Sequence, residues 1–201
     1  MAENTAKPVL SEAVLPQRGQ ALWMKRLALV LLGVTALAVA AKIKVPLWPS
    51  PVPITLGTFA VLTIGAAYGP RLGFVTILAY LAVGAVGMDV FANSSAETYG
   101  LGYMMGGTGG YLAGYVLAGL TLGVLARRGW DRNVAWMALA MLIGNLVIYV
   151  PGVLWLHQFT SGWTQTLDWG LIPYLIGDGL KLALAALLLP AAWRMVGEAR
   201  G

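Results

Sequence analysis

Long apolar stretches, separated by short polar or glycine- and proline-containing segments, make up most of this 201-residue chain. A membrane-spanning helix needs roughly 20 predominantly apolar residues, and six of the stretches approach that length. The pattern therefore predicts an all-α membrane protein with six transmembrane helices. The predicted helices cover residues 22–41, 54–68, 72–87, 110–126, 136–156 and 171–193.

The second and third predicted helices are short, and only Tyr68, Gly69, Pro70 and Arg71 divide them. Proline removes a backbone donor and disfavours helix at the residue before it. We therefore expect a tight hairpin at this point rather than one long helix.

Composition agrees with a membrane protein. The chain is 59% hydrophobic and 10% charged, with a mean hydropathy of +0.76, which is too apolar for a soluble domain with a hydrated surface. Residues 1–20 are polar and contain proline, so we predict a disordered cytoplasmic tail rather than a signal peptide. Residues 21–197 are predicted to form one six-helix transmembrane domain.

The basic residues gather on one side of the predicted spans. The positive-inside rule therefore predicts that both termini are cytoplasmic, and that the longer connections 42–53, 88–109 and 157–170 face outward. The same rule explains the net charge of +5 without a nucleic-acid partner. The inner side collects Lys7, Arg18, Lys25, Arg26, Arg71, Arg127, Arg128, Arg132, Arg194 and Arg200, whereas the outer side receives only Lys42 and Lys44.

Several kinds of chemistry are excluded by the residues present. There is no cysteine, so thiolate metal sites and cysteine nucleophiles are ruled out, and the single histidine, His157, cannot form a multi-histidine metal site. No catalytic Ser, His and Asp arrangement is found. The glycine cluster of residues 106–110 lacks the lysine of a phosphate-binding loop. We expect no catalytic residue, no metal and no cofactor, and hence not an enzyme.

Asp178 and Lys181 stand out because they lie in "IGDGLKLALAALLLP", which is otherwise apolar enough to cross a bilayer. An ionised side chain there costs roughly 3 kcal/mol or more, so it normally faces a protein interior. Three positions apart on a helix, the two side chains share a face and can pair. The alternative is an ion pair that only stabilises helix packing. The attraction within a buried ion pair, however, rarely compensates for the free energy lost when its charges leave water. We favour a ligand site, with Asp178 accepting N–H donors and Lys181 donating to a carbonyl or carboxylate.

The first outer connection holds four prolines within residues 46–53. Such a segment is stiff, and we interpret it as a preorganised lid with Trp48 as an apolar wall, a plain linker being the alternative. Thr55 and Thr58 follow it, and their hydroxyls either cap the next helix or touch the ligand, with capping favoured. In the second outer connection, Asn93 has the donor and acceptor to bind an amide-like ligand, although asparagine in loops more often serves a turn.

Small residues predict close helix contacts. Gly110 and Gly114, followed by Gly119 and Gly123, are spaced for tight packing of one helix against its neighbours. Ala36 and Ala40 predict a smooth face on the first helix, which another helix of the same chain or of a partner can approach. On the fifth helix, Asn145 and Tyr149 are spaced to face a pocket together, and His157 is expected at the membrane interface.

Four segments of the chain, in this order, resemble the BioY family. They read "VPLWPSPVPITLGTFAVLTIGAAYGPRLG", "GMDVFANS", "GGTGGYLAGY" and "IPYLIGDGLKLALA", and the resemblance covers nearly everything after residue 30. The chain departs from the family pattern at Gly57, where the family commonly has glutamine, and at Gly106 and Gly107, where its glycine cluster often contains proline.

The resemblance implies a substrate-binding S component of an energy-coupling-factor transporter for biotin, located in the cell membrane. Such a protein captures biotin from outside and delivers it inward when coupled to a transmembrane T component and two ATPases. Residues 21–197 would then be the substrate-binding domain, with the S component meeting its T component through the Ala36 and Ala40 face. The residues implied for biotin are Asn93, Asp178 and Lys181, with Tyr111, Trp48 and Phe59 expected as apolar walls.

Alternatives remain open at this point. The chain could serve another small vitamin, or belong to a different class as an intramembrane enzyme or scaffold. Its ATPases could be dedicated or shared, or it could work alone as a homo-oligomer.

Overall fold

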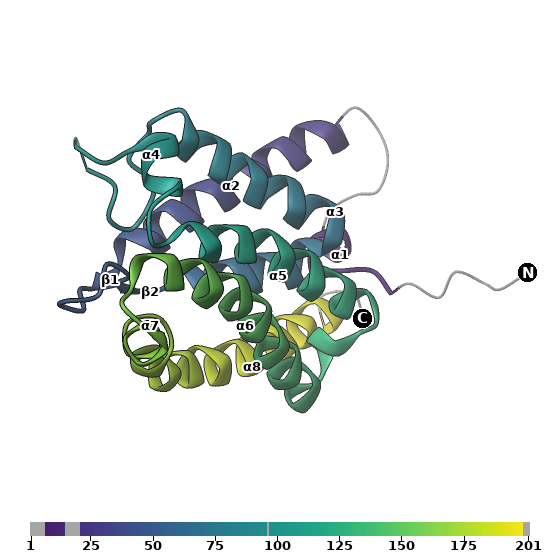
Figure 1. Cartoon of the computed structure of the whole chain (residues 1–201). Helices are drawn as coiled ribbons and strands as arrows, with labels where there is room; N and C mark the ends of the chain where they lie inside the picture. Colours follow the sequence, from purple (N-terminus) through teal and green to yellow (C-terminus); the bar gives the residue numbers. More distant parts are fainter. Residues whose placement is uncertain (1–6, 15–20, 96, 199–201) are drawn as a thin grey trace, which may run out of the picture.

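The computed structural model describes residues 7–14, 21–95 and 97–198. Five long helices dominate this part of the chain and lie alongside one another in a single bundle (Figure 1). Each belongs to one of the five stretches that are long and apolar enough to cross a membrane. The prediction of an all-helical protein is therefore confirmed, apart from one pair of two-residue strands. The long helices are α2 (Ala21–Lys42), α3 (Gly57–Ala85), α5 (Gly109–Arg127), α6 (Val134–Leu156) and α8 (Leu175–Glu198).

Shorter elements cover the two ends of this bundle. One end, which we call the loop end, carries strands β1 (Lys44–Val45) and β2 (Ile54–Thr55) and helices α4 (Gly100–Met104) and α7 (Trp163–Gly170). The opposite end, the basic end, carries helix α1 (Leu10–Val14), the 3₁₀ turn Trp130–Arg132 and the last turn of α8. Two further 3₁₀ turns, His157–Phe159 and Ile172–Tyr174, flank α7.

Helix α3 is interrupted in its middle. Gly69 has a φ of 78°, a left-handed conformation that favours glycine, and Pro70 follows it. A Cβ added to Gly73 would lie 3.2 Å from the Cα of Gly65, whereas eight residues of straight helix span about 12 Å. The two halves of α3 therefore lie side by side, and the chain reversal predicted at residues 68–71 is confirmed.

The predicted start of the second helix was wrong. Ile54 and Thr55 form β2 rather than helix, and they pair antiparallel with β1, with Thr55 opposite Lys44. Helix begins only at Gly57. The pairing of two short segments on either side of the proline-rich connection overrides their helical pattern.

The predicted last helix was also wrong at its start. Leu171 has φ −134° and ψ −63°, and the turn Ile172–Tyr174, which contains Pro173, separates it from α8. The non-helical backbone of Leu171 ends the preceding segment, and the turn that holds Pro173, a residue tolerated at the start of a helix, leads into α8 at Leu175. Helix α7, in the connection expected at residues 157–170, was not predicted from the sequence.

The expectation of disorder over residues 1–20 was wrong for residues 7–14. Val9 is fully buried, the backbone N–H of Lys7 donates to the carbonyl of Arg127 at 2.9 Å, and Glu12 forms an ion pair with Arg127. These contacts tie α1 to the end of α5 and to the break in α3. Residues 1–6 and 15–20 of the predicted tail lie outside the described residues.

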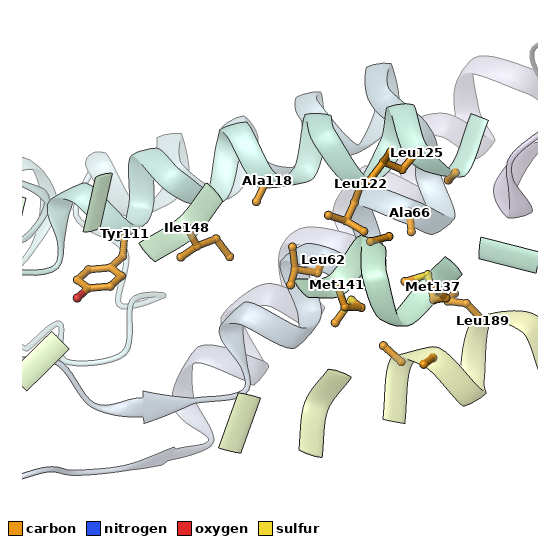
Figure 2. Packing of buried hydrophobic residues seen from close by; sticks show 14 of the residues in the cluster. Leu62, Ala66, Tyr111, Ala118, Leu122, Leu125, Met137, Met141, Ile148 and Leu189 are labelled. Atoms are coloured by element: carbon orange, nitrogen blue, oxygen red, sulfur yellow. The ribbon is translucent and has the colours of Figure 1, made fainter. Parts of the chain in front are cut away.

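Glycines on α5 allow two neighbouring helices to approach closely, as predicted. A Cβ on Gly114 would lie 2.8 Å from the Cα of Ile148 in α6, and one on Gly123 would lie 2.4 Å from the backbone nitrogen of Pro70 in α3. Leu62, Leu122 and Met141 fill the space between the three helices (Figure 2). This packing holds α3, α5 and α6 together and fixes where their loop ends stand.

Candidate binding site

A cavity near the loop end is enclosed by the beginnings of α3, α5 and α8, the second half of α6 and the two connections that follow α2 and α3. Asp178 and Lys181 line it together with Thr58 and Tyr149. These four residues come from three different helices, α3, α6 and α8. They meet because α3 and α8 start at the loop end and α6 ends there. Side chains far apart in sequence thus meet at one depth in the bundle.

Asp178 and Lys181 form a buried ion pair. The Nζ atom of Lys181 lies 2.8 Å from Oδ1 of Asp178, and the side chains are only 11% and 6% exposed, respectively. Lys181 also donates to the hydroxyl of Thr58 at 3.1 Å, and this hydroxyl lies 3.5 Å from Oδ1 of Asp178. Lysine carries three N–H donors, so one donor remains for a further acceptor in the cavity.

Tyr149 holds the other side of the carboxylate. Its hydroxyl donates to Oδ2 of Asp178, while Lys181 and Thr58 occupy Oδ1. An ionised carboxylate has about four acceptor positions, so one position is left at Oδ2. The site therefore offers one N–H donor and one carboxylate acceptor side by side, which suits a ligand with both an acceptor and an N–H donor.

Tyrosine rings form most of the remaining wall. The hydroxyl of Tyr111 donates to the carbonyl of Gly170 at 2.8 Å, and that of Tyr174 donates to the carbonyl of Trp169 at 2.9 Å. With their polar tips held by backbone groups, these rings present apolar faces to the cavity. The tyrosines of the wall are Tyr80, Tyr103, Tyr111, Tyr115, Tyr149 and Tyr174.

The cavity is narrow in this structure. Its volume is about 60 Å³, and a single water needs about 10–15 Å³ by the same measure. A few water-sized particles fit, but a bicyclic ligand requires side chains or the covering connections to move outward.

A set of hydrogen bonds holds the two outer connections together over the cavity. Lys44 Nζ donates to Oδ1 of Asn93 at 2.8 Å, and Nδ2 of Asn93 donates to the carbonyl of Pro51 at 3.2 Å. Lys42 forms an ion pair with Asp89 at 2.5 Å. The bond from Lys42 holds the pKa of the exposed Asp89 carboxyl below its usual value. We call the contacts of Lys42, Lys44, Asp89 and Asn93 the outer latch.

The structure brings some of the predicted site residues together and leaves others apart. Tyr111 lines the cavity with Asp178 and Lys181. The side chain of Asn93 is engaged in the outer latch, next to Ala92, which lines the cavity. Phe59 packs against the buried cluster, and Trp48 is 94% exposed. A contact between Trp48 and a ligand therefore requires the first outer connection to close.

The sequence indicated only some of the threonine and tyrosine side chains that line the cavity. Thr55 accepts from the backbone N–H of Gly57, the first residue of α3, at 3.0 Å, although the N-cap position itself is Leu56 and has no side-chain cap bond. The capping favoured for Thr58 was wrong, because its hydroxyl bridges the ion pair.

The shared pocket position predicted for Asn145 and Tyr149 is confirmed in a groove between α6 and α8, which both residues line together with Asp178. Of the two, only Tyr149 also lines the cavity of Lys181. Tyr115 and Tyr174 carried no signal in the sequence, since aromatic residues are common in apolar helices.

The predicted partner face on α2 is divided. Ala36 is exposed, whereas Ala40 is buried against the bundle. Of the five candidate spans, the one containing α2 is the least buried.

In the described residues, no group of three His, Asp or Glu side chains is placed to hold a metal ion.

The fold and the cavity define a helical membrane protein with a buried ion pair lining a cavity near one end of its bundle. The family model described as the BioY family matches residues 10–198. This chain therefore belongs to the BioY family, as its four sequence segments suggested, and it is a multi-pass membrane protein.

Named relatives and a solved structure are similar over most of the chain. The "Probable biotin transporter BioY" of Pyrococcus horikoshii is 37% identical over 82% of this chain and 93% of its own length. The "Biotin transporter BioY" of Thermotoga maritima is 33% identical over 76% of this chain and 86% of its own. A crystal structure of the S-component for biotin from an ECF-type ABC transporter has a TM-score of 0.75 at 20% identity, covering 89% of this chain and 95% of that one. This last likeness supports the same fold.

Proposed function

We propose that this chain is the biotin-binding S component of an energy-coupling-factor transporter. The observation that carries the proposal is the buried Asp178–Lys181 pair, which presents one free donor and one free acceptor inside a tyrosine-lined cavity. The ureido ring of biotin has two N–H donors and a carbonyl, its thiolane is apolar, and its side chain ends in a carboxylate. Membership of a family whose relatives are named biotin transporters supports this ligand.

In the proposed complex, Asp178 accepts an N–H of the ureido ring, and Lys181 donates to a carbonyl or carboxylate oxygen. Tyr111 provides an apolar wall, while Asn93 and Trp48 approach the ligand from the outer connections. Phe59 supports the wall from behind. Because the cavity is narrow, biotin enters when the outer latch opens.

Biotin binding to the purified protein tests this proposal. Asp178→Asn and Lys181→Ala should each weaken binding at least about tenfold, which corresponds to about 1.4 kcal/mol. Asp168→Asn is the matched control, since Asp168 is exposed on α7 at the same end of the bundle. Undiminished binding in both site variants would overturn the assignment.

Competition separates biotin from other vitamins. Thiamine and riboflavin, added in excess, should fail to displace labelled biotin from the wild-type protein. Displacement by either compound would favour an S component for that vitamin. Turnover of a lipid or peptide, with no vitamin bound, would favour an intramembrane enzyme.

We further propose six membrane crossings, with the basic end in the cytoplasm and the loop end outside the cell membrane. The reversal at Gly69 makes α3 two antiparallel segments, and the basic residues favour this orientation. Because the chain contains no cysteine, single cysteines can report the sidedness. Asp168→Cys should react with an impermeant thiol reagent on intact cells, and Arg128→Cys only after the membrane is opened.

Coupling to a T component and two ATPases completes the proposed transporter. The outward face of α2, with Ala36, is the proposed contact, since this helix is the least covered by the rest of the chain. Ala36→Leu should reduce co-purification of a membrane subunit and ATPases with the tagged chain. Ala113→Leu, at an exposed alanine of α5, is the control, and biotin binding should be unchanged in both variants. Isolation of the chain only as a homo-oligomer would oppose this partnership.

A further inference from the structure

A second cleft lies at the basic end of the bundle, far along the helices from the vitamin site. It has a volume of about 560 Å³ and is formed by α1, the beginning of α2, the break in α3 and the end of α5. None of its lining residues borders the cavity of Asp178 and Lys181. The proposed biotin site therefore leaves this cleft unexplained.

The lining of the cleft is positively charged. Arg26, Arg71 and Arg127 line it with a single acidic residue, Glu12. Glu12 pairs with both terminal nitrogens of Arg127. Among the described residues, no ion pair includes Arg26 or Arg71, so two guanidinium groups remain for an anion. Arginine is suited to phosphate because its planar group can donate two parallel hydrogen bonds.

The cleft also has an apolar wall. Leu27 and Val75 are 49% and 51% exposed, so this wall is open to the outside of the bundle rather than sealed as a core. Tyr68 also lines the cleft, and its hydroxyl donates to the carbonyl of Leu29 at 3.1 Å. The apolar wall consists of Leu22, Leu27, Val30, Leu72 and Val75.

Unpaired arginines beside an open apolar wall fit an amphiphile with an anionic head and a hydrocarbon tail. We propose that this cleft binds an anionic phospholipid of the leaflet at the basic end, with its phosphate between Arg26 and Arg71 and an acyl chain along the wall of α2 and α3. Basic pockets between transmembrane helices commonly take such headgroups. A free phosphate would leave the apolar wall unused, and a zwitterionic lipid would leave the two positive charges uncompensated.

Lipid retention by the purified full chain tests the proposal. Native mass spectrometry would compare the wild type with Arg26→Gln/Arg71→Gln after exchange into equal mixtures of phosphatidylglycerol and phosphatidylcholine. A basic residue near a charged headgroup contributes about 1 kcal/mol, or about fivefold in affinity. The double variant should therefore lose at least about fivefold of the wild-type preference for phosphatidylglycerol. Raising the salt concentration should weaken the wild-type preference as well.

Arg128→Gln/Arg194→Gln is the matched control, because both arginines are exposed at the same end and neither lines the cleft. This variant should keep the preference, and both double variants should keep wild-type biotin affinity, which shows that they are folded. Equal losses in both variants, or no preference in the wild type, would overturn the proposal. Displacement of the lipid by glycerol phosphate alone would assign the site to a soluble phosphate, and displacement only by a co-purifying membrane subunit would make it a protein contact.

Discussion

Lys181 and Asp178 compensate each other's charge one turn apart on α8, with Nζ and Oδ1 separated by 2.8 Å. Thr58 of α3 and Tyr149 of α6 complete the arrangement by bonding to the same two side chains. The charges are thus held in place before any ligand arrives, and both side chains line the cavity.

The first prediction concerns the cost of separating this pair. Lys181→Met should destabilise the biotin-free protein by about 3–5 kcal/mol, because breaking a buried pair leaves an uncompensated charge. Asp178→Asn combined with Lys181→Met should recover much of this stability while binding remains lost. Thermal unfolding in detergent and biotin titration measure the two effects separately. Equal unfolding temperatures for the single and double variants would contradict the coupling.

The second prediction concerns the role of Tyr149. Its hydroxyl orients Oδ2 of Asp178, so Tyr149→Phe removes one hydrogen bond to a charged group, worth about 1.5–3 kcal/mol. Biotin affinity should fall by at least about tenfold. Tyr99→Phe, at an exposed tyrosine of the loop end, should leave affinity unchanged. If the Tyr149 variant binds biotin normally, the phenol does not position the carboxylate.

The third prediction concerns the outer latch. Lys44→Met removes the bond to Asn93 and loosens the two connections that cover the cavity. Because Lys44 and Asn93 do not line the cavity, both association and dissociation of biotin should become faster, by about fivefold for the loss of roughly 1 kcal/mol. Stopped-flow measurement of both rate constants checks this result. Slower association in the variant would mean that Lys44 attracts the ligand rather than restraining the connections.

The fourth prediction concerns pH and the basic end. Asp131 is 1% exposed, and its Oδ1 atom has no hydrogen-bond partner among the described residues, although Trp193 donates to Oδ2. Burial raises the pKa of this carboxyl above its ordinary value near 3.8. At pH values between the ordinary pKa of the unfolded state and the raised pKa of the folded state, the folded protein binds more protons than the unfolded protein. The carboxyl of Asp131 therefore makes the free energy of unfolding fall as pH rises.

Asp131→Asn should remove the contribution of Asp131 to the pH dependence of the unfolding free energy. Relative to the variant, the wild type should therefore become more stable as pH is lowered from 7 toward 4. Unfolding temperatures of the two proteins across this range give the comparison, which cancels the titration of groups that they share. Parallel curves would show that Asp131 has the same pKa folded and unfolded.

The sequence determined the elements that depend on local pattern. Apolar runs of membrane-spanning length specified the helices, and Gly69 with Pro70 specified the reversal inside α3, because glycine adopts the left-handed conformation freely and proline disfavours helix before it. Asp178 and Lys181 could be recognised since charged residues in an apolar span require partners. The glycine spacing of α5 likewise anticipated its close packing.

Tertiary structure alone decided which side chains surround the pair. Thr58 and Tyr149 are 120 and 29 residues from Asp178, and only the packing of α3 and α6 against α8 brings them into hydrogen-bonding range. Helix α1 is a second example. Its short sequence does not predict a helix, and its place depends on the burial of Val9 against the bundle. Local pattern fixes where helices form, but contacts between distant segments depend on how the helices pack, and that packing determines which residues form the site.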